Sequence, residues 1–132
     1  MAKEALLQTM WLGFGEDKIL RVRILEGAKV DLQQSKLMNE SMLRMAVEVP
    51  FPVLIDTRAN FIWERDAQEF LAANSDFRLA VAIITNNPIS RLITNSYVKF
   101  FKPAYPTKIF SSEEKAIVWL KEKMEEKKSS AE

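Results

Sequence analysis

The sequence predicts an α/β fold: a small mixed, mostly parallel β-sheet with an N-terminal β-hairpin and four helices. Near the N-terminus, apolar residues alternate with polar ones, which is typical of half-buried strands. Further on, short apolar runs alternate with segments whose apolar residues recur three and four apart, as in helices. Strands that alternate with helices favour parallel pairing through right-handed crossovers. With 132 residues, the chain is expected to form a single domain over residues 1–132.

The first half contains the predicted hairpin, a helix and a third strand. Residues 8–27 form the hairpin, and residues 15–17 supply its turn. Residues 30–48 are predicted to be helical, with Asp31 as the N-cap and one apolar stripe at helical spacing: Leu37, Met38, Met42 and Met45. Two prolines then frame a third strand at residues 53–56.

The second half is predicted to hold three helices and two strands. Residues 63–74 form a helix, and residues 77–85 are apolar enough for a central strand covered on both faces. The next helix begins with Asn87 as N-cap and Pro88 at its first position. A short strand at 107–110 precedes the last helix, for which Ser111 and Glu114 have capping-box spacing. Residues 125–132 form a charged tail that we expect to fray.

Composition excludes several classes of function. The chain has no cysteine and no histidine, so thiol chemistry, histidine-dependent catalysis and the usual zinc sites are excluded. The formal net charge is +1, which is too small to produce the strong positive electrostatic field of a nucleic-acid-binding protein. The segment "MAKEALLQTMW" has no long apolar core after a basic region, so we do not expect it to be a signal peptide. The longest apolar run is too short to span a membrane. We therefore expect a cytoplasmic protein with no cofactor, no metal, no nucleic-acid partner and no membrane insertion.

Polar side chains follow two of the predicted strands at their carboxyl ends, where ligands bind to open α/β sheets. The first group is a candidate binding or docking loop of four residues: Asp56, Thr57, Arg58 and Asn60. The second group, at the start of the following helix, is a candidate anion site: Thr85, Asn87, Ser90 and Arg91. The alternative is that these residues are ordinary caps, with Arg91 paired to Asp56.

Three strand ends also suggest a receiver-like phosphoacceptor. Asp56, Thr85 and Lys108 stand near the positions that response-regulator receivers use for the acceptor acid, the hydroxyl and the lysine. Receivers also need an acidic pair after the first strand to hold Mg²⁺, because phosphoryl transfer depends on neutralised charge. Here the first strand turns directly into a hairpin, which weighs against this function.

Four aromatic residues within nine positions offer a candidate interface: Tyr97, Phe100, Phe101 and Tyr105. Two lysines, Lys99 and Lys102, lie between them. Aromatic side chains are enriched at the centres of protein interfaces. The alternative is that the four pack in the core, next to a turn framed by prolines.

Three segments resemble the SpoIIAA-like, or STAS-like, single-domain proteins of bacteria: "EGAKVDL", "PVLIDTR" and "TKIFSSEEKAIVWL". The resemblance implies a non-enzymatic domain that acts by binding. In regulatory members, a serine in an Asp-Ser-Ser-Gly type motif is phosphorylated, and the added charge disrupts docking. Asp56 and Thr57 match the first two positions, but Arg58 replaces the second serine and no glycine follows. Thr57 would be the one local phosphoacceptor.

The sequence therefore predicts a non-catalytic STAS-like domain that binds a protein partner or self-associates, for example as a homodimer. One alternative is a binder of a small phosphate-bearing or lipid-like ligand at the strand-end crevice. The second alternative is the receiver-like phosphoacceptor at Asp56.

Overall fold

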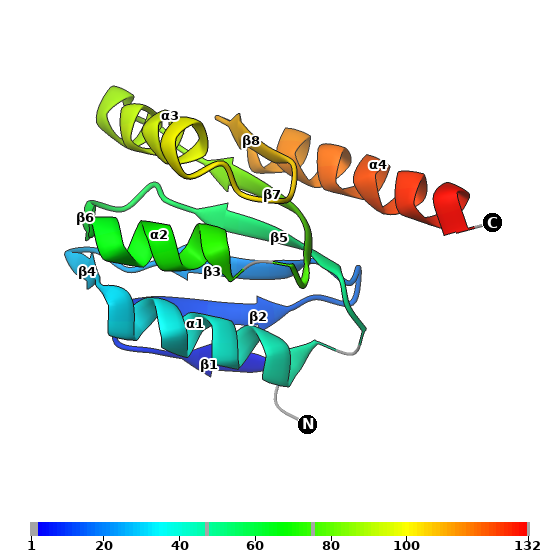
Figure 1. Cartoon of the computed structure of the whole chain (residues 1–132), viewed down its shortest axis with the longest axis horizontal. Helices are drawn as coiled ribbons and strands as arrows, with labels where there is room; N and C mark the ends of the chain where they lie inside the picture. The colour runs from blue at the N-terminus through cyan, green and yellow to red at the C-terminus, as the bar shows by residue number, and fades with distance from the viewer. Residues whose placement is uncertain (1–2, 47, 75, 132) are drawn as a thin grey trace.

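The computed structural model describes residues 3–46, 48–74 and 76–131, and its centre is a six-stranded mixed sheet (Figure 1). The strand order is β1-β2-β3-β5-β7-β8. β1 and β2 pair antiparallel, as do β2 and β3, whereas the pairs from β3 to β8 are parallel. The bounds are β1 Glu4–Leu6, β2 Met10–Phe14, β3 Leu20–Ile24, β5 Phe51–Asp56, β7 Arg78–Ile84 and β8 Thr107–Phe110.

The predicted hairpin and parallel strands are confirmed. β2 and β3 pair with Leu12 opposite Val22, so the apolar side chains of both strands share one face of the sheet. β5 and β7 lie at the centre and are buried along almost their whole length. This burial on both faces is the reason why residues 77–85 read as a continuous apolar run.

Three strands of three residues each were not predicted: β1, β4 (Ala28–Val30) and β6 (Phe61–Trp63). β4 and β6 pair parallel in a separate two-stranded sheet, supported by an ion pair of 3.3 Å between Lys29 and Glu64. Three residues are too few to show a period of two. The partner that makes such a segment a strand is distant in sequence.

Four helices cover the sheet: α1 (Leu32–Met45), α2 (Arg65–Ala73), α3 (Pro88–Phe101) and α4 (Glu113–Ala131). α1, α2 and α3 follow one another along one side, and α4 lies apart from them (Figure 1). The larger hydrophobic core joins α1, α2 and α3 to strands β2, β3, β5 and β7. A smaller core on the opposite face joins α4 to β5 and β7.

α4 covers only part of its face of the sheet. Ala116 and Leu120 of α4 are fully buried against the strands, whereas β2 and β3 extend beyond the reach of the helix. On this uncovered part, the Trp11 ring lies across Gly13, and Arg23 stacks over that ring with 5.4 Å to its centroid. One face of the hairpin is therefore solvated, as its alternating sequence predicts.

The helix starts follow the predicted caps in two cases of three. The side chain of Asp31 accepts from the Gln34 N–H, and that of Asn87 accepts from the Ser90 N–H. In α4 the capping side chain is Ser112, which accepts from the Lys115 N–H, and not the predicted Ser111. The segment from residue 125, expected to fray, is helical through Ala131 with exposed side chains to residue 130.

Within the described part of the chain, no helix is long and apolar enough to cross a membrane.

Candidate functional site

The two predicted loops leave the sheet side by side, because β5 and β7 are paired neighbours in parallel register. Asp56 lies opposite Ile84 at the last position of the two strands. The backbone N–H of Thr57 donates to the Ile84 carbonyl at 2.9 Å, and its hydroxyl donates to the same oxygen at 2.7 Å. Thr57 therefore ties the candidate docking loop to the segment that leads into α3.

This position corrects the expectation for Thr57. Its side chain is only 6% exposed, and its hydroxyl proton is used in a buried hydrogen bond. A kinase needs an accessible hydroxyl, so Thr57 is not presented as a phosphoacceptor in this structure. Strand alternation could not have indicated this, because β5 is buried on both faces and its two sets of alternating positions do not differ in exposure.

Asp56 and Arg58 form a local ion pair with each other, so their charges are not free to bind a ligand. Arg58 donates from Nη2 and Nε to the carboxylate of Asp56 at 2.7 and 3.0 Å, and its backbone N–H adds a bond of 3.0 Å. Burial raises the pKa of Asp56, but the hydrogen bonds from Arg58 outweigh it and hold that pKa below its ordinary value. The predicted alternative partner, Arg91, is not the residue that pairs with Asp56.

The end of the loop is also fixed. The backbone and side-chain amides of Asn60 donate to the two carboxylate oxygens of Glu26 at 3.0 and 2.9 Å. The Gly27 N–H in turn donates to the Asn60 carbonyl at 2.7 Å. Of the four predicted loop residues, Arg58 and Asn60 are exposed, and both are already bound to carboxylates of this chain.

The predicted anion site at the start of α3 is partly occupied by its own cap. The Asn87 side chain accepts a hydrogen bond of 2.8 Å from the Ser90 N–H, and Ser90 itself is buried. Thr85 is fully buried, which corrects its place in a surface site. Its Oγ1 has no hydrogen-bond partner within the described residues. Arg91 is exposed on the first turn of the helix.

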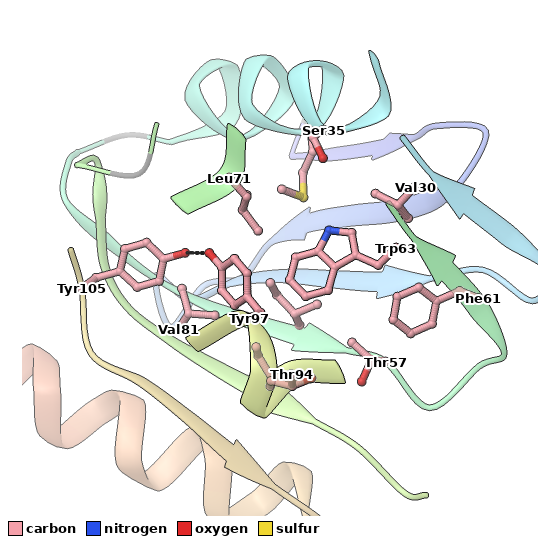
Figure 2. Close-up of a pocket in the computed structure, with 13 residues that line it drawn as sticks. Val30, Ser35, Thr57, Phe61, Trp63, Leu71, Val81, Thr94, Tyr97 and Tyr105 are labelled. Carbon is pink, nitrogen blue, oxygen red and sulfur yellow. Dashed lines mark hydrogen bonds between the residues drawn. The ribbon is translucent and has the colours of Figure 1, made fainter. Parts of the chain in front are cut away.

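The four aromatic residues of the candidate interface are divided between core and surface. Tyr97 and Tyr105 are buried, and their hydroxyls share a hydrogen bond of 3.1 Å (Figure 2). Burial raises the pKa of both hydroxyls. Phe101 is half-buried against the larger core, and Phe100 is 73% exposed. The prediction of a four-residue surface cluster is therefore corrected for Tyr97 and Tyr105.

Arg78 is a buried cation that sequence reasoning missed. Its guanidinium donates to the Asn39 side chain and to the Asn74 carbonyl, and it stacks on Phe77 with 4.5 Å to the ring centroid. None of the ion pairs between described residues includes it. Burial therefore lowers the pKa of Arg78. Neutral oxygens and a ring compensate this charge, which connects the middle of α1 to the segment between α2 and β7.

α3 carries an apolar flank that the fold leaves uncovered. We call this the α3 face and define it by four residues that fall on one stripe of the helix: Ile89, Leu92, Ser96 and Phe100. The three large side chains are 72%, 67% and 73% exposed. Ser96 and Phe100 also line a groove of about 290 Å³ toward α2, which ends at Arg65 and Gln68. At about 100° per residue, Arg91 lies some 140° from Ser96 and outside this stripe.

A second feature lies inside the molecule, between the sheet and the helices α1, α2 and α3. It is a small cavity of about 40 Å³ with mostly apolar walls (Figure 2). Trp63 and Tyr97, whose ring centroids are 4.7 Å apart, form one wall. Thr57 and Thr94 line it with hydroxyls that donate to backbone carbonyls. Sequence patterns gave no signal for this cavity, because its lining comes from seven separate elements and two loops.

The receiver-like alternative lacks its metal ligands in this structure. No group of three or more acidic side chains that could hold a metal ion occurs within residues 3–46, 48–74 and 76–131. Lys108 lies near the ring of Phe110 at 5.5 Å rather than beside Asp56.

Comparison with solved structures shows the fold. The chain is similar to an uncharacterised protein of the DUF3478 family from Shewanella loihica PV-4, described as having a SpoIIAA-like fold. The TM-score is 0.63 at 18% identity, over 91% of this chain and 98% of that one. A protein of unknown function from Arthrobacter sp. FB24 matches at 22% identity over 83% of this chain and 90% of that one, with a TM-score of only 0.33.

The SpoIIAA-like fold expected from the sequence is thereby confirmed, together with the mixed, mostly parallel sheet and its four helices. A search of curated protein sequences found no match. A family model covers residues 10–124, which is most of the chain and includes every element from β2 to the middle of α4. The chain therefore belongs to the family described as domain of unknown function DUF7793.

Proposed function

We propose that this chain is a non-catalytic binding domain that docks on another protein, or on a second copy of itself, through the α3 face. The observation that carries the proposal is the exposure of Ile89, Leu92 and Phe100 on one flank of a helix whose inner side is well packed. Large apolar side chains that cluster on a surface mark interaction sites more often than single ones do. An apolar helix flank beside a groove suits helix-in-groove or helix-on-helix docking.

The geometry around this face supports docking in two ways. Ser96 lies between Leu92 and Phe100 on the stripe, so a partner backbone could approach closely at the middle of the face. The groove toward α2 supplies a pocket beside Phe100 that could receive a partner side chain. The near-neutral net charge of +1 adds little repulsion between two copies.

The expected phosphorylation switch does not form part of this proposal. Three internal interactions hold the loop where related domains carry a switch serine. Thr57 hydrogen-bonds to the Ile84 carbonyl, Arg58 pairs with Asp56, and Asn60 hydrogen-bonds to Glu26. Asp56 lies in a hollow with Arg23 and Glu113, on the side of the sheet that α4 covers, so the Asp56–Arg58 ion pair is not part of the α3 face. Regulation by charge at Thr57 would first require its bond to Ile84 to open.

Site-specific photo-crosslinking in the native host tests the proposal. A photoreactive phenylalanine analogue is placed at position 100 and, as a matched control, at position 118, where Val118 is 54% exposed on α4. We expect a discrete adduct from position 100 and none from position 118. An adduct of twice the chain mass indicates self-association, and any other discrete mass indicates a different partner.

The proposal is wrong if position 100 gives no adduct, or if both positions give the same adducts. Self-association has a second readout in light scattering behind size exclusion. A dimer should become a monomer in Phe100→Asp, because a charge buried at an interface centre is strongly unfavourable. The same change at Val118 should leave the measured mass unaltered.

A further inference from the structure

The internal cavity contains a polar atom that the fold leaves without a partner. Ser35, on α1, is only 1% exposed and lines the cavity. Its Oγ has no hydrogen-bond partner within the described residues. Figure 2 shows this hydroxyl directed from α1 toward the space in front of Trp63. Leaving a buried hydroxyl without a hydrogen-bond partner is unfavourable, so such an atom requires an explanation.

The tyrosine pair offers a second incomplete hydrogen-bonding group. Tyr97 and Tyr105 both line the cavity, and a single hydrogen bond joins their hydroxyls. Each hydroxyl has one proton, and that bond uses only one of the two. The second proton has no acceptor among the described contacts. The cavity therefore combines apolar walls with unused hydroxyl groups at its border.

The residues that line the cavity determine which charge a ligand can have and from which side it can enter. None of the described residues that line the cavity is charged, so an ion there would be desolvated without compensation. Phe61 and Trp63 are the lining residues that are half-exposed, whereas the others are buried. The opening to solvent therefore lies along β6.

We propose that this cavity is a binding site for a small uncharged molecule that has an apolar body and one hydroxyl or carbonyl group. The polar group enters the cavity, whose free space is about 40 Å³, and hydrogen-bonds to Ser35 Oγ. The apolar body extends toward β6 and contacts the rings of Phe61 and Trp63. This ligand class differs from the phosphate-bearing class considered from the sequence, because the cavity has no cation to receive a phosphate. The site is also separate from the α3 face.

Phenol and toluene form a matched pair of probes, since they have nearly the same shape and differ in the hydroxyl. Binding is followed by the shifts of backbone amide signals in nuclear magnetic resonance spectra of the whole chain. We expect phenol to bind about three- to tenfold more tightly than toluene, the ratio that one net hydrogen bond provides. The shifted signals should include those of α1 and β6.

Three variants assign the site. Ser35→Ala should abolish the preference for phenol while retaining toluene binding. Ser35→Val should abolish binding of both probes, because its larger side chain fills the inner space. Ser41→Ala is the control, since Ser41 is also buried on α1 but does not line the cavity. Circular dichroism establishes that each variant is folded.

The inference is overturned if neither probe shifts any signal near the cavity at millimolar concentration, which would mean that the space holds water only. It is also overturned if Ser35→Ala keeps the full preference for phenol. It is overturned as well if the probes shift only signals of α3 or α4 and Ser35→Val leaves those shifts unchanged. That result would mean that the probes bind to aromatic side chains on the surface.

Discussion

At the residue scale, the direction of a side chain decides its role. Asp56, Thr57 and Arg58 are consecutive, yet their side chains make different contacts: an ion pair joins the outer two, and a buried hydrogen bond holds the middle one. The parity of the strand does not predict this for Thr57, because β5 is buried on both faces. No local pattern predicts that Arg78 is buried, because its compensation comes from Asn39 and Asn74, which lie on different elements.

The buried tyrosine pair predicts how the protein responds to alkaline pH. Burial raises the folded-state pKa of Tyr97 and Tyr105 above the value of about 10 that unfolded tyrosine has. The stability from these groups is therefore complete below about pH 10 and falls as the pH rises beyond it. These are the two tyrosines of the chain, so the ultraviolet absorbance of tyrosinate reports on them alone.

We expect no tyrosinate signal while the chain is folded, and its appearance together with the loss of the circular dichroism signal. The prediction fails if tyrosinate forms near pH 10 while the dichroism remains native. Tyr105→Phe isolates the contribution of Tyr97, because it leaves a single tyrosine to titrate.

At the element scale, caps and apolar stripes were predictable because their signals lie within a few residues of each other. Asn87 and Pro88 mark the start of α3, and Asp31 marks that of α1, as the sequence predicts. Adjacent serines made the cap of α4 ambiguous, and the structure uses Ser112. The exposure of the α3 face was not predictable from periodicity, since its apolar residues continue round to the buried side.

The N-cap of α3 predicts a measurable loss of stability. Asn87→Ala removes the acceptor of the Ser90 N–H and should lower the free energy of unfolding by about 0.5–2 kcal/mol. Asn95→Ala is the matched control on the same helix, where the side chain is exposed and alanine has the higher helix propensity. Urea unfolding of both variants measures the difference. Equal destabilisation by the two changes would contradict the capping role.

At the scale of the whole molecule, the sequence predicts the α/β class and the position of the central strand because alternation and apolar runs persist over many residues. It does not predict β4 and β6, which depend on a pairing between segments more than thirty positions apart. The cavity has the same origin, since the two-stranded sheet forms part of its wall. Features assembled from distant short segments are therefore the ones that only the structure reveals.

The arrangement of layers predicts an order of hydrogen exchange. Amides of β5 and β7 should exchange slowest, because both strands are paired on each side and covered on both faces. Amides of β1, β4 and β6 should exchange fastest among the strands, since these are short and have a single paired neighbour. Mass spectrometry of peptides after timed exchange measures this order. Protection of β4 and β6 equal to that of β5 would contradict it.

The incomplete cover that α4 gives to the sheet has a consequence for how the chain can vary. In β3, Leu20, Val22 and Ile24 are buried, whereas Arg21 and Arg23 lie on the solvated face. Substitutions should therefore be accepted at every second position of this strand but at almost none of the positions in β5. Among diverged relatives, the strands that α4 covers should therefore change slowly at every position. The strands beyond its edge should change faster at their solvated positions.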